Sequence, residues 1–331
     1  MKKTYTHIQE VVWNDKVKLV VADVDETIAG VYKLATPEMI KELELLLQEG
    51  KAIFFVTGAG LQSVRERITD LISPAFRKHI LIGNCHGAEL WGFTTEGILN
   101  EKPFYSAYEE KFNEDQKKQW REVMNQLIRE FQLKIFPTMP PADFRLKVKT
   151  DVLSVMMVDR GVQITLEVVN AHNLSEEQVK ELEKKLGIAI PLTNDVYDLR
   201  YALIDRAQQL FDQYGLPLYC KTGGTFALDF IVQGVDKTRT VKFVTDSDSI
   251  LKTIGLTKED IVNSEHIETW GDKYMGPDFL MSLAFPPEVR SIDFRDEDPT
   301  KLSSEYNIQL WKGSKRLHEG TLEYIQSRKK F

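Results

Sequence analysis

The sequence predicts an α/β protein with a doubly wound, mostly parallel sheet that is interrupted by an inserted α+β domain. Three observations support this. Short apolar runs alternate with amphipathic stretches in the first third of the chain, which is the pattern of β-α-β units in a parallel sheet. Near residue 103 a long charged helical stretch and alternating strands replace that pattern, and it returns after Gly234. The core is therefore expected at 1–102 and 233–331, and the insertion at 103–232.

Within the core, short apolar runs predict buried strands at 18–22, 52–56 and 79–82. The first helix is expected to begin at Thr36-Pro37, because threonine is a favourable N-cap and proline is tolerated at the first helical position, and to end at Gly50. The other core helices are expected at 61–72, before Ser73-Pro74, and at 237–245, 249–254 and 320–328.

The insertion is expected to combine helices with antiparallel strands. Residues 144–149 alternate apolar with basic side chains, which predicts an edge strand, and a hairpin is expected across Asp159-Arg160-Gly161. The hairpin strands are expected at 152–158 and 162–169, further strands at 216–220 and 226–232, and helices at 107–131, 175–186 and 195–214.

Composition excludes several classes of function. The chain has 331 residues with 43 Lys and Arg against 50 Asp and Glu, and the net charge of −7 opposes general attraction to nucleic acid or to anionic membranes. Cys85 and Cys220 are far apart and form no CxxC pair, so neither a disulfide framework nor a cysteine zinc site is indicated. The apolar runs are strand-sized rather than membrane-spanning. A cytoplasmic protein without nucleic-acid or membrane partners is expected.

Two carboxylates follow the first buried strand, in Asp23-Val24-Asp25-Glu26-Thr27. Ligands of open α/β sheets bind at the carboxyl ends of the strands. Two neighbouring carboxylates at such a place repel one another unless a proton or a hard divalent cation is present. The pair therefore predicts a metal-dependent site, and the alternative is a solvated acidic turn.

Thr57-Gly58 follows the second strand, where a hydroxyl and a main-chain N–H could hold phosphoryl oxygens. Gly58 and Gly60 also imitate the start of a dinucleotide-binding fingerprint. The third glycine position is Ser63, however, and the next strand ends in Gly83-Asn84 rather than in an acid that could bind a ribose. A nucleotide-dependent dehydrogenase is therefore disfavoured.

Further candidate residues lie after the insertion. Lys237 stands where the core pattern resumes, and Asp272 and Asp278 lie in a loop with glycine and proline. Taken singly, these residues are most simply a surface lysine and turn-forming aspartates. Their order along the chain is more informative: an acidic pair, Thr-Gly, Lys, and then Gly-Asp with a second Asp.

This ordered set resembles the haloacid dehalogenase superfamily of phosphohydrolases, and the place of the insertion resembles its class IIB (Cof-like), which carries an α+β cap between the second and third motifs. Residues 83–90 are similar to the "NGA" turn before that cap, and residues 228–237 to the segment that leads from the cap to the motif lysine. The resemblance implies a Rossmann-like core and a cap that selects the substrate.

The resemblance also implies a role for each motif residue. Asp23 would be the nucleophile and Asp25 the general acid and base, while Thr57, Gly58 and Lys237 would bind the phosphoryl group. Mg²⁺ would be held by Asp23, Asp25 (through its carbonyl) and Asp272, with Asp278 as a further candidate ligand. The implied reaction is hydrolysis of a phosphomonoester through an aspartyl-phosphate, with a small phosphorylated metabolite, best a sugar phosphate, as substrate.

The sequence departs from the family pattern at three places. Glu26 replaces the usual glycine, Ala59 stands where an arginine often follows Thr-Gly, and the fourth motif, 272–278, is longer than usual and lacks an asparagine. Ala59 removes one possible anion contact, and Glu26 with the longer fourth motif keeps open a catalytically silent binding protein as an alternative.

In the cap, Arg145, Lys147 and Lys149 would share one strand face and, with Lys221, could receive an anionic part of the substrate. The alternative for these residues is a solvated basic edge strand. A functional basic face would favour a phosphomutase, because a mutase must grip a second phosphate.

Overall fold

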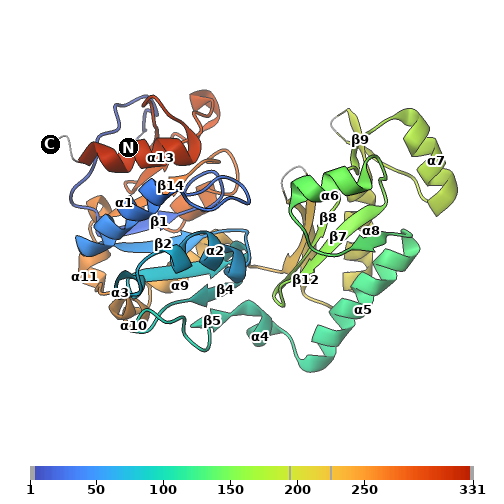
Figure 1. The fold of residues 1–331 in the computed structure, drawn as a ribbon, viewed down its shortest axis with the longest axis horizontal. Coiled ribbons are helices and arrows are strands. Elements are labelled where there is room, and N and C mark those ends of the chain that lie inside the picture. Colours follow the sequence, from blue (N-terminus) through green and yellow to red (C-terminus); the bar gives the residue numbers. More distant parts are fainter. Residues whose placement is uncertain (1–3, 194, 224–225, 329–331) are drawn as a thin grey trace. The chain divides into compact units, whose positions relative to one another are not determined.

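A computed structural model describes residues 4–193, 195–223 and 226–328. The chain divides into two compact units, Met1–Ser106 with Val235–Phe331, and Ala107–Gly234. We call them the core unit and the inserted unit (Figure 1). Within the described residues, no helix has both the length and the apolar character needed to cross a membrane.

The core unit is built on an eight-stranded sheet with the order β16-β15-β14-β1-β2-β3-β4-β5. The strands from β16 to β3 are parallel, and β4 and β5 continue the sheet antiparallel. This confirms the mostly parallel sheet predicted from the sequence. The strands are β1 (Leu19–Ala22), β2 (Ala52–Val56), β3 (Ile80–Asn84), β4 (Glu89–Trp91), β5 (Tyr105–Ser106), β14 (Ile267–Gly271), β15 (Arg290–Asp293) and β16 (Ile308–Leu310).

Strand β1 is the point at which the sheet changes its direction of growth. The chain proceeds from β1 to β2 and β3 on one side, and the later strands β14, β15 and β16 extend the sheet on the other. In doubly wound sheets this switch point opens a crevice at the carboxyl ends of the strands, where ligands bind. The residues that follow β1 and β14 are therefore placed where a site is expected.

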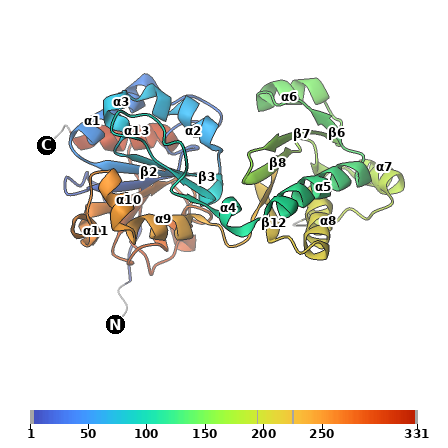
Figure 2. The same cartoon turned by 90° about the horizontal axis from the view of Figure 1, so that it is seen from below.

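Helices cover both faces of the core sheet (Figures 1 and 2). On one face α1 (Pro37–Gln48), α2 (Leu61–Arg67) and α13 (Leu317–Ser327) pack on the strands through a single apolar cluster that contains Phe55, Leu43 and Tyr324. The opposite face carries α9 (Lys237–Thr245), α10 (Asp248–Thr253) and α11 (Lys258–Ile261), and α12 (Phe279–Ser282) lies against α9. The short α3 (Pro74–Arg77) lies beside α1.

The local signals in the sequence determine several boundaries. The Thr36 side chain accepts a hydrogen bond from Met39 N–H, Pro37 is the first helical residue, and Gly50 follows the helix with φ +83°. The helix expected over 61–72 is shorter, because it ends at Arg67 and a 3₁₀ turn follows. The reason is that the Arg67 carbonyl accepts the N–H of Ala35, and not the N–H of a residue one helical turn further along the chain.

The inserted unit has a five-stranded sheet of order β12-β13-β8-β7-β6 and a small three-stranded sheet of order β10-β11-β9. The hairpin of β7 and β8 turns at Asp159-Arg160-Gly161, as predicted. Helix α8 packs on β12 and against α5. The elements are α4 (Ala107–Lys111), α5 (Glu114–Glu130), β6 (Lys134–Phe136), α6 (Pro141–Val148), β7 (Ser154–Asp159), β8 (Gln163–Glu167), β9 (His172–Leu174), α7 (Glu176–Leu186), β10 (Leu192–Thr193), β11 (Val196–Asp198), α8 (Leu199–Gln213), β12 (Leu218–Gly223) and β13 (Ala227–Val232).

Two expectations for the inserted unit are wrong, and a third, the helix over 195–214, begins later, at Leu199, because Val196–Asp198 form strand β11. The helix expected over 107–131 is divided, because Asn113 starts α5 with a capping box that pairs it with Gln116. Residues 144–149 form most of helix α6 rather than an edge strand. Phe144 and Val148, four residues apart, are buried on one side of this helix, whereas Leu146 is 78% exposed, so the apparent alternation concealed a helical spacing.

Candidate active site

Asp23 and Asp25 lie directly after β1, at the switch point of the sheet. The Asp23 N–H donates to the Trp270 carbonyl (2.9 Å), which continues the pairing of β1 with β14 as far as Asp23. Asp23 is 7% exposed, whereas Asp25 is half-buried. The turn that follows is closed by main-chain hydrogen bonds to the Val24 carbonyl. The two carboxylates are thus held by a rigid strand end.

Glu26, which replaces the usual glycine, adopts a left-handed conformation with φ +62°. Glycine reaches this region without a steric penalty, so a glutamate here costs backbone strain of about 1 kcal/mol. Its side chain bonds locally, because the Val31 N–H donates to Glu26 Oε1 (3.3 Å). The backbone conformation at position 26 is therefore one that glycine adopts easily, and the glutamate adds a side chain without changing that conformation.

Thr57 and Gly58 follow β2, the strand next to β1. Thr57 is buried, and its hydroxyl oxygen accepts the N–H of Ala59 (3.1 Å). A Cβ built at Gly58 would lie 2.7 Å from Cε1 of His86, so the imidazole packs directly on the glycine. His86 reaches this place through a turn in which Cys85, His86 and Gly87 all have positive φ. No local signal in the sequence indicated this contact.

Lys237 is the first residue of α9 and is 3% exposed. Its Nζ donates to Asp23 Oδ1 and to Asp278 Oδ1, each at 2.7 Å. Burial alone would lower the pKa of Lys237, but the two carboxylates raise it above its ordinary value. Lys237 is therefore a buried cation that joins the residue after β1 to the residue before α12.

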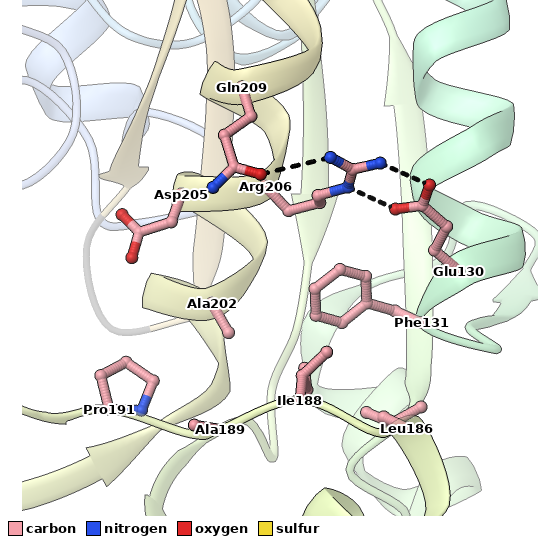
Figure 3. A pocket seen from close by; sticks show the side chains of 10 residues that line it. All are labelled: Glu130, Phe131, Leu186, Ile188, Ala189, Pro191, Ala202, Asp205, Arg206 and Gln209. Carbon is pink, nitrogen blue, oxygen red and sulfur yellow. Dashed lines mark hydrogen bonds and ion pairs between the residues drawn. The ribbon is translucent and has the colours of Figure 1, made fainter.

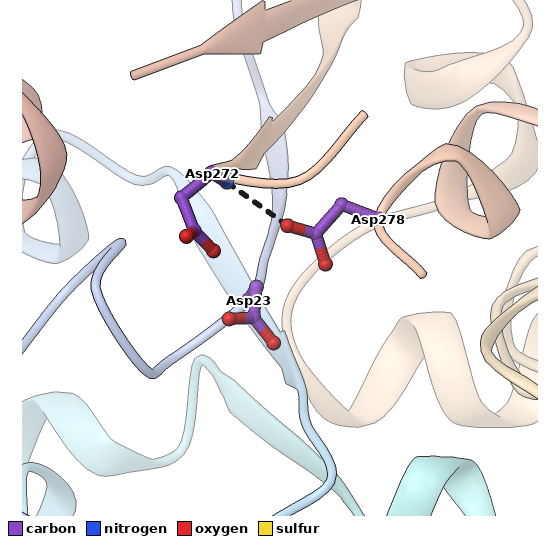
Figure 4. Close-up of side chains that lie close together, drawn as sticks. All are labelled: Asp23, Asp272 and Asp278. Atoms are coloured by element: carbon purple, nitrogen blue, oxygen red, sulfur yellow. Dashed lines mark hydrogen bonds between the residues drawn. The ribbon is translucent and has the colours of Figure 1, made fainter. Parts of the chain in front are cut away.

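Asp272 and Asp278 come together despite the longer fourth motif. Asp278 Oδ2 accepts the main-chain N–H of Asp272 at 2.9 Å, as Figure 4 shows, and that of Lys273 also at 2.9 Å. This return is tight, because a Cβ at Gly271 would lie 2.7 Å from Asp278 Oδ2. The Tyr274 hydroxyl bonds the Thr269 hydroxyl (2.7 Å) and anchors the loop to β14. The extra loop residues therefore do not displace Asp278.

The three carboxylates crowd one another. One oxygen from each of Asp23, Asp272 and Asp278 lies within 4.8 Å of the others, and all three residues are buried. Burial raises the pKa of Asp23 to about 8 although Lys237 opposes the shift, and burial together with Asp278 raises the pKa of Asp272 to about 6 although Arg295 opposes it. Burial would also raise the pKa of Asp278, but Lys237 and two N–H donors lower it overall.

This donor set fits a hard divalent cation. All three ligand atoms are carboxylate oxygens, which Mg²⁺ prefers. Lys237 and Arg295 lie at the cluster, yet the pKa values of Asp23 and Asp272 stay raised, so these two cations do not fully compensate the buried negative charge. A bound cation would add positive charge and stabilise the ionised carboxylates. Arg295 pairs with Asp272 through both Nε and Nη2.

Two basic residues near the site were not foreseen from the sequence. Arg295 follows β15 and binds Asp272, and Arg67 at the end of α2 binds Asp25, with Nη2 at 2.6 Å from Oδ1. Both contacts join residues far apart in the chain. A lone arginine in a helix or a loop has no local pattern that reveals such a partner.

The basic residues predicted to bind substrate lie in the inserted unit and do not share a strand face. Arg145 and Lys147 are two positions apart on helix α6, which places them on different sides of it, and Lys149 ends the helix with φ +51°. Arg145 stacks on the ring of Phe226 (3.8 Å from the guanidinium carbon to the centroid). Lys221 lies in β12 opposite Asp229. The prediction of one basic strand face is wrong.

A pocket of about 630 Å³ lies within the inserted unit, among α5, α7 and α8 (Figure 3). Phe131 and Ile188 contribute apolar surface, and Arg206 forms a double hydrogen bond with Glu130 (2.6 and 2.8 Å) at its edge. None of the site residues predicted from the sequence lines it. The pocket is therefore separate from the carboxylate cluster.

Comparison with known proteins identifies the fold. No protein-family model and no curated protein matches the sequence. The structure is similar to that of a haloacid dehalogenase-like hydrolase from Bacteroides thetaiotaomicron, with a TM-score of 0.53 and 15% identity over 94% of this chain and 98% of that chain. It is also similar to that of a protein from Eubacterium rectale, with a TM-score of 0.51 and 12% identity over 95% and 99% of the two chains.

Likeness at such low identity is a likeness of fold. It agrees with the switch of strand order at β1 and with the order of the motifs along the chain. The finer assignment to class IIB stays a prediction. The chain has the fold of the haloacid dehalogenase superfamily.

Proposed function

We propose that this protein is a Mg²⁺-dependent phosphomonoester hydrolase that acts on a small phosphorylated metabolite. One observation carries the proposal: Lys237 bridges Asp23 and Asp278 at the switch point of the sheet, with Asp272 beside them. A buried lysine paired with carboxylates is often no more stable than well-packed apolar residues in the same place, so stability alone does not explain its presence. Binding a dianionic phosphoryl group next to a nucleophilic carboxylate would explain it.

The first chemical step would be attack by an Asp23 carboxylate oxygen on phosphorus. A new phosphorus–oxygen bond forms to Asp23 while the bond to the ester oxygen breaks, and Asp25 gives its proton to the departing alkoxide. Asp25 suits this role for two reasons. It lies two residues after the nucleophile at the same strand end, and it is only half-buried, so a leaving group can reach its carboxyl group.

The second step would release phosphate. Asp25, now a carboxylate, takes a proton from water as the water oxygen attacks phosphorus, and the bond between phosphorus and Asp23 breaks. Both residues then return to their initial states. Two easier displacements thus replace one difficult hydrolysis.

Charge on the transferring oxygens would be stabilised by groups already in place. Lys237 Nζ, the Thr57 hydroxyl and the Gly58 N–H are the proposed phosphoryl-binding groups. Asp23, Asp272 and Asp278 are the proposed side-chain ligands of Mg²⁺, with the Asp25 carbonyl as a further one. When bound, Mg²⁺ supplies positive charge at the phosphoryl oxygens.

A sugar phosphate is the substrate that we favour, and selection of the substrate by the inserted unit stays a prediction. The mutase alternative has lost its specific support, because Arg145, Lys147 and Lys149 do not form one basic face. The silent-protein alternative is disfavoured by the buried, paired geometry of Lys237, which a protein without catalysis has no need to keep.

The proposal is tested by phosphate release from sugar phosphates, nucleotides and aryl phosphates, with and without Mg²⁺. Asp23→Asn should lower metal-dependent turnover by at least about 10³-fold while the protein stays folded. Asp260→Asn is the matched control and should keep turnover at the wild-type level. Asp260 also pairs with a lysine of the core unit, but that lysine, Lys18, directly precedes β1, whereas Asp23 directly follows it. Turnover by Asp23→Asn equal to wild type, or no turnover by wild type on any ester, would refute the proposal.

A further inference from the structure

Arg67 makes an unusual set of contacts. It is the last residue of α2 and is 6% exposed. Its Nη2 donates to Asp25 Oδ1 (2.6 Å) and to the Gly30 carbonyl (2.9 Å), and its Nε donates to the Lys33 carbonyl (2.8 Å). A buried guanidinium requires such partners, because an unpaired one would be very costly. These three partners belong to the segment that follows β1, and Nη1 also donates to Ser63 Oγ within α2 (3.4 Å).

The main chain of Arg67 binds the same segment. Its carbonyl accepts the N–H of Ala35 (2.9 Å), which is the contact that ends α2. One residue therefore holds residues 25–35 against α2 at four points, and only one of them, Asp25, is a charged group. The contact with Asp25 is the one that joins this clamp to the proposed chemistry.

The two oxygens of Asp25 are in different situations. Oδ1 bonds Arg67, whereas Oδ2 accepts no hydrogen bond from any residue in the described part of the chain. A half-exposed aspartate without a partner would sample several rotamers. With Oδ1 fixed by a short charge-assisted hydrogen bond, Oδ2 is kept in one direction.

We propose that Arg67 is a positioning residue that orients Asp25 for proton transfer, an inference that rests on the function proposed above. In this role Arg67 acts through Asp25 and not on the substrate. It fixes Oδ1, so that Oδ2 carries the proton to the leaving group and later takes one from water. Misplacing a catalytic group by about 1 Å can cost about 10²-fold in rate, which sets the scale of the expected effect.

Substituting a residue that only holds the structure and substituting one that positions Asp25 should have different effects on the hydrolysis rates of esters with different leaving groups. Phenolate needs a proton as it departs, whereas 4-nitrophenolate is stable enough to depart without one. Loss of proton transfer in the first step therefore slows phenyl phosphate much more than 4-nitrophenyl phosphate. General damage to the site slows both esters by the same factor.

The experiment compares kcat/KM for these two esters in wild type, Arg67→Met, Asp25→Ala and the double variant. This ratio reports the steps up to departure of the leaving group and leaves out hydrolysis of the aspartyl-phosphate, which is the same for both esters and also uses Asp25. Arg67→Met should lower kcat/KM about 10- to 50-fold for phenyl phosphate and less than about 3-fold for 4-nitrophenyl phosphate. In the Asp25→Ala background it should have almost no further effect. Arg77→Met is the matched control, because Arg77 also donates to main-chain carbonyls of its own unit, those of Ile72 and Asp70, and should leave kcat/KM unchanged.

The outcomes separate this inference from the proposed function. Equal losses on both esters, or additive losses in the double variant, would overturn the positioning role and leave the phosphatase standing. No turnover by wild type on these two esters or on any other ester of the panel would remove the proposed function and this inference with it. If Arg67→Met does not fold, Arg67→Lys is used, because lysine keeps the charge but lacks the several N–H donors of the guanidinium. Hydrogen exchange at the Ala35 amide then reports whether the main-chain contact between Ala35 and residue 67 is lost.

Discussion

Replacing Lys237 by methionine tests whether the carboxylate cluster is held together by a buried cation. The substitution keeps the length of the side chain and its apolar part but removes the charge. Asp23 and Asp278 would each lose a 2.7 Å hydrogen bond and would face one another without a counter-charge. We therefore expect the core unit to lose stability in metal-free buffer, where nothing else can neutralise the two carboxylates.

The magnitude follows from the burial of the pair. Removing one partner of a buried ion pair costs about 3–5 kcal/mol. The lower end applies here, because Asp278 keeps two main-chain N–H donors at 2.9 Å. A loss of about 3 kcal/mol corresponds to a fall in Tm of about 6–12 °C for a unit of this size.

Urea denaturation and calorimetry in EDTA measure this loss. Lys18→Met is the control, because the Lys18–Asp260 pair has the same chemistry but a side chain that is 41% exposed, and its removal should cost less than about 1 kcal/mol. A loss below about 1 kcal/mol for Lys237→Met would show that the pair is effectively solvated, and the electrostatic reasoning for the site would be wrong.

Three further predictions address the metal, a close contact and a buried ion pair. Asp272→Asn and Asp278→Asn should each weaken Mg²⁺ binding at least about 10-fold in calorimetric titration, since each removes a charged oxygen ligand, and unchanged affinity in both would exclude the proposed ligand set. Gly58→Ala should cost about 0.5–1.5 kcal/mol in urea denaturation, because its Cβ would lie 2.7 Å from the His86 ring and would push that ring off its rotamer. His86→Ala should relieve most of this cost, and an equal cost in both backgrounds would show that the strain does not come from His86. Glu268→Met should destabilise the core by about 3–5 kcal/mol, because Arg290 and two other donors lose a fully buried acceptor, and a neutral result in thermal unfolding would contradict this.

Local signals in the sequence were sufficient for much of the core. The helix from Pro37 to Gln48 begins and ends where Thr36-Pro37 and Gly50 predict, and α9 has the predicted bounds. These elements are determined by residues within a few positions of their ends, and the alternation of strands and helices then determined the fold class. The parallel sheet is confirmed for the same reason.

Other features depend on contacts that no short segment contains. The apparent strand at 144–149 is a helix, because three apolar residues two apart are too few to distinguish the two periods, and burial of Phe144 and Val148 decides between them. Helix α2 ends at Arg67, whose carbonyl accepts the N–H of Ala35, and α1 and β2 separate these two residues in the sequence. The meeting of Asp23, Lys237 and Asp278 was expected only through the family resemblance, and their chemical roles stay predictions.

The loop between Asp272 and Asp278 has a consequence for how such sites evolve. Its two ends are fastened, at Tyr274 to β14 and at Asp278 to the main chain of Asp272, whereas residues 275–277 between them are exposed. Lengthening an exposed loop costs little closure entropy. Insertions at Gly276 and Pro277, beyond the Met275 N–H that donates to Glu297, should therefore cost little stability, and a lineage could gain a new surface there while its chemistry is inherited unchanged.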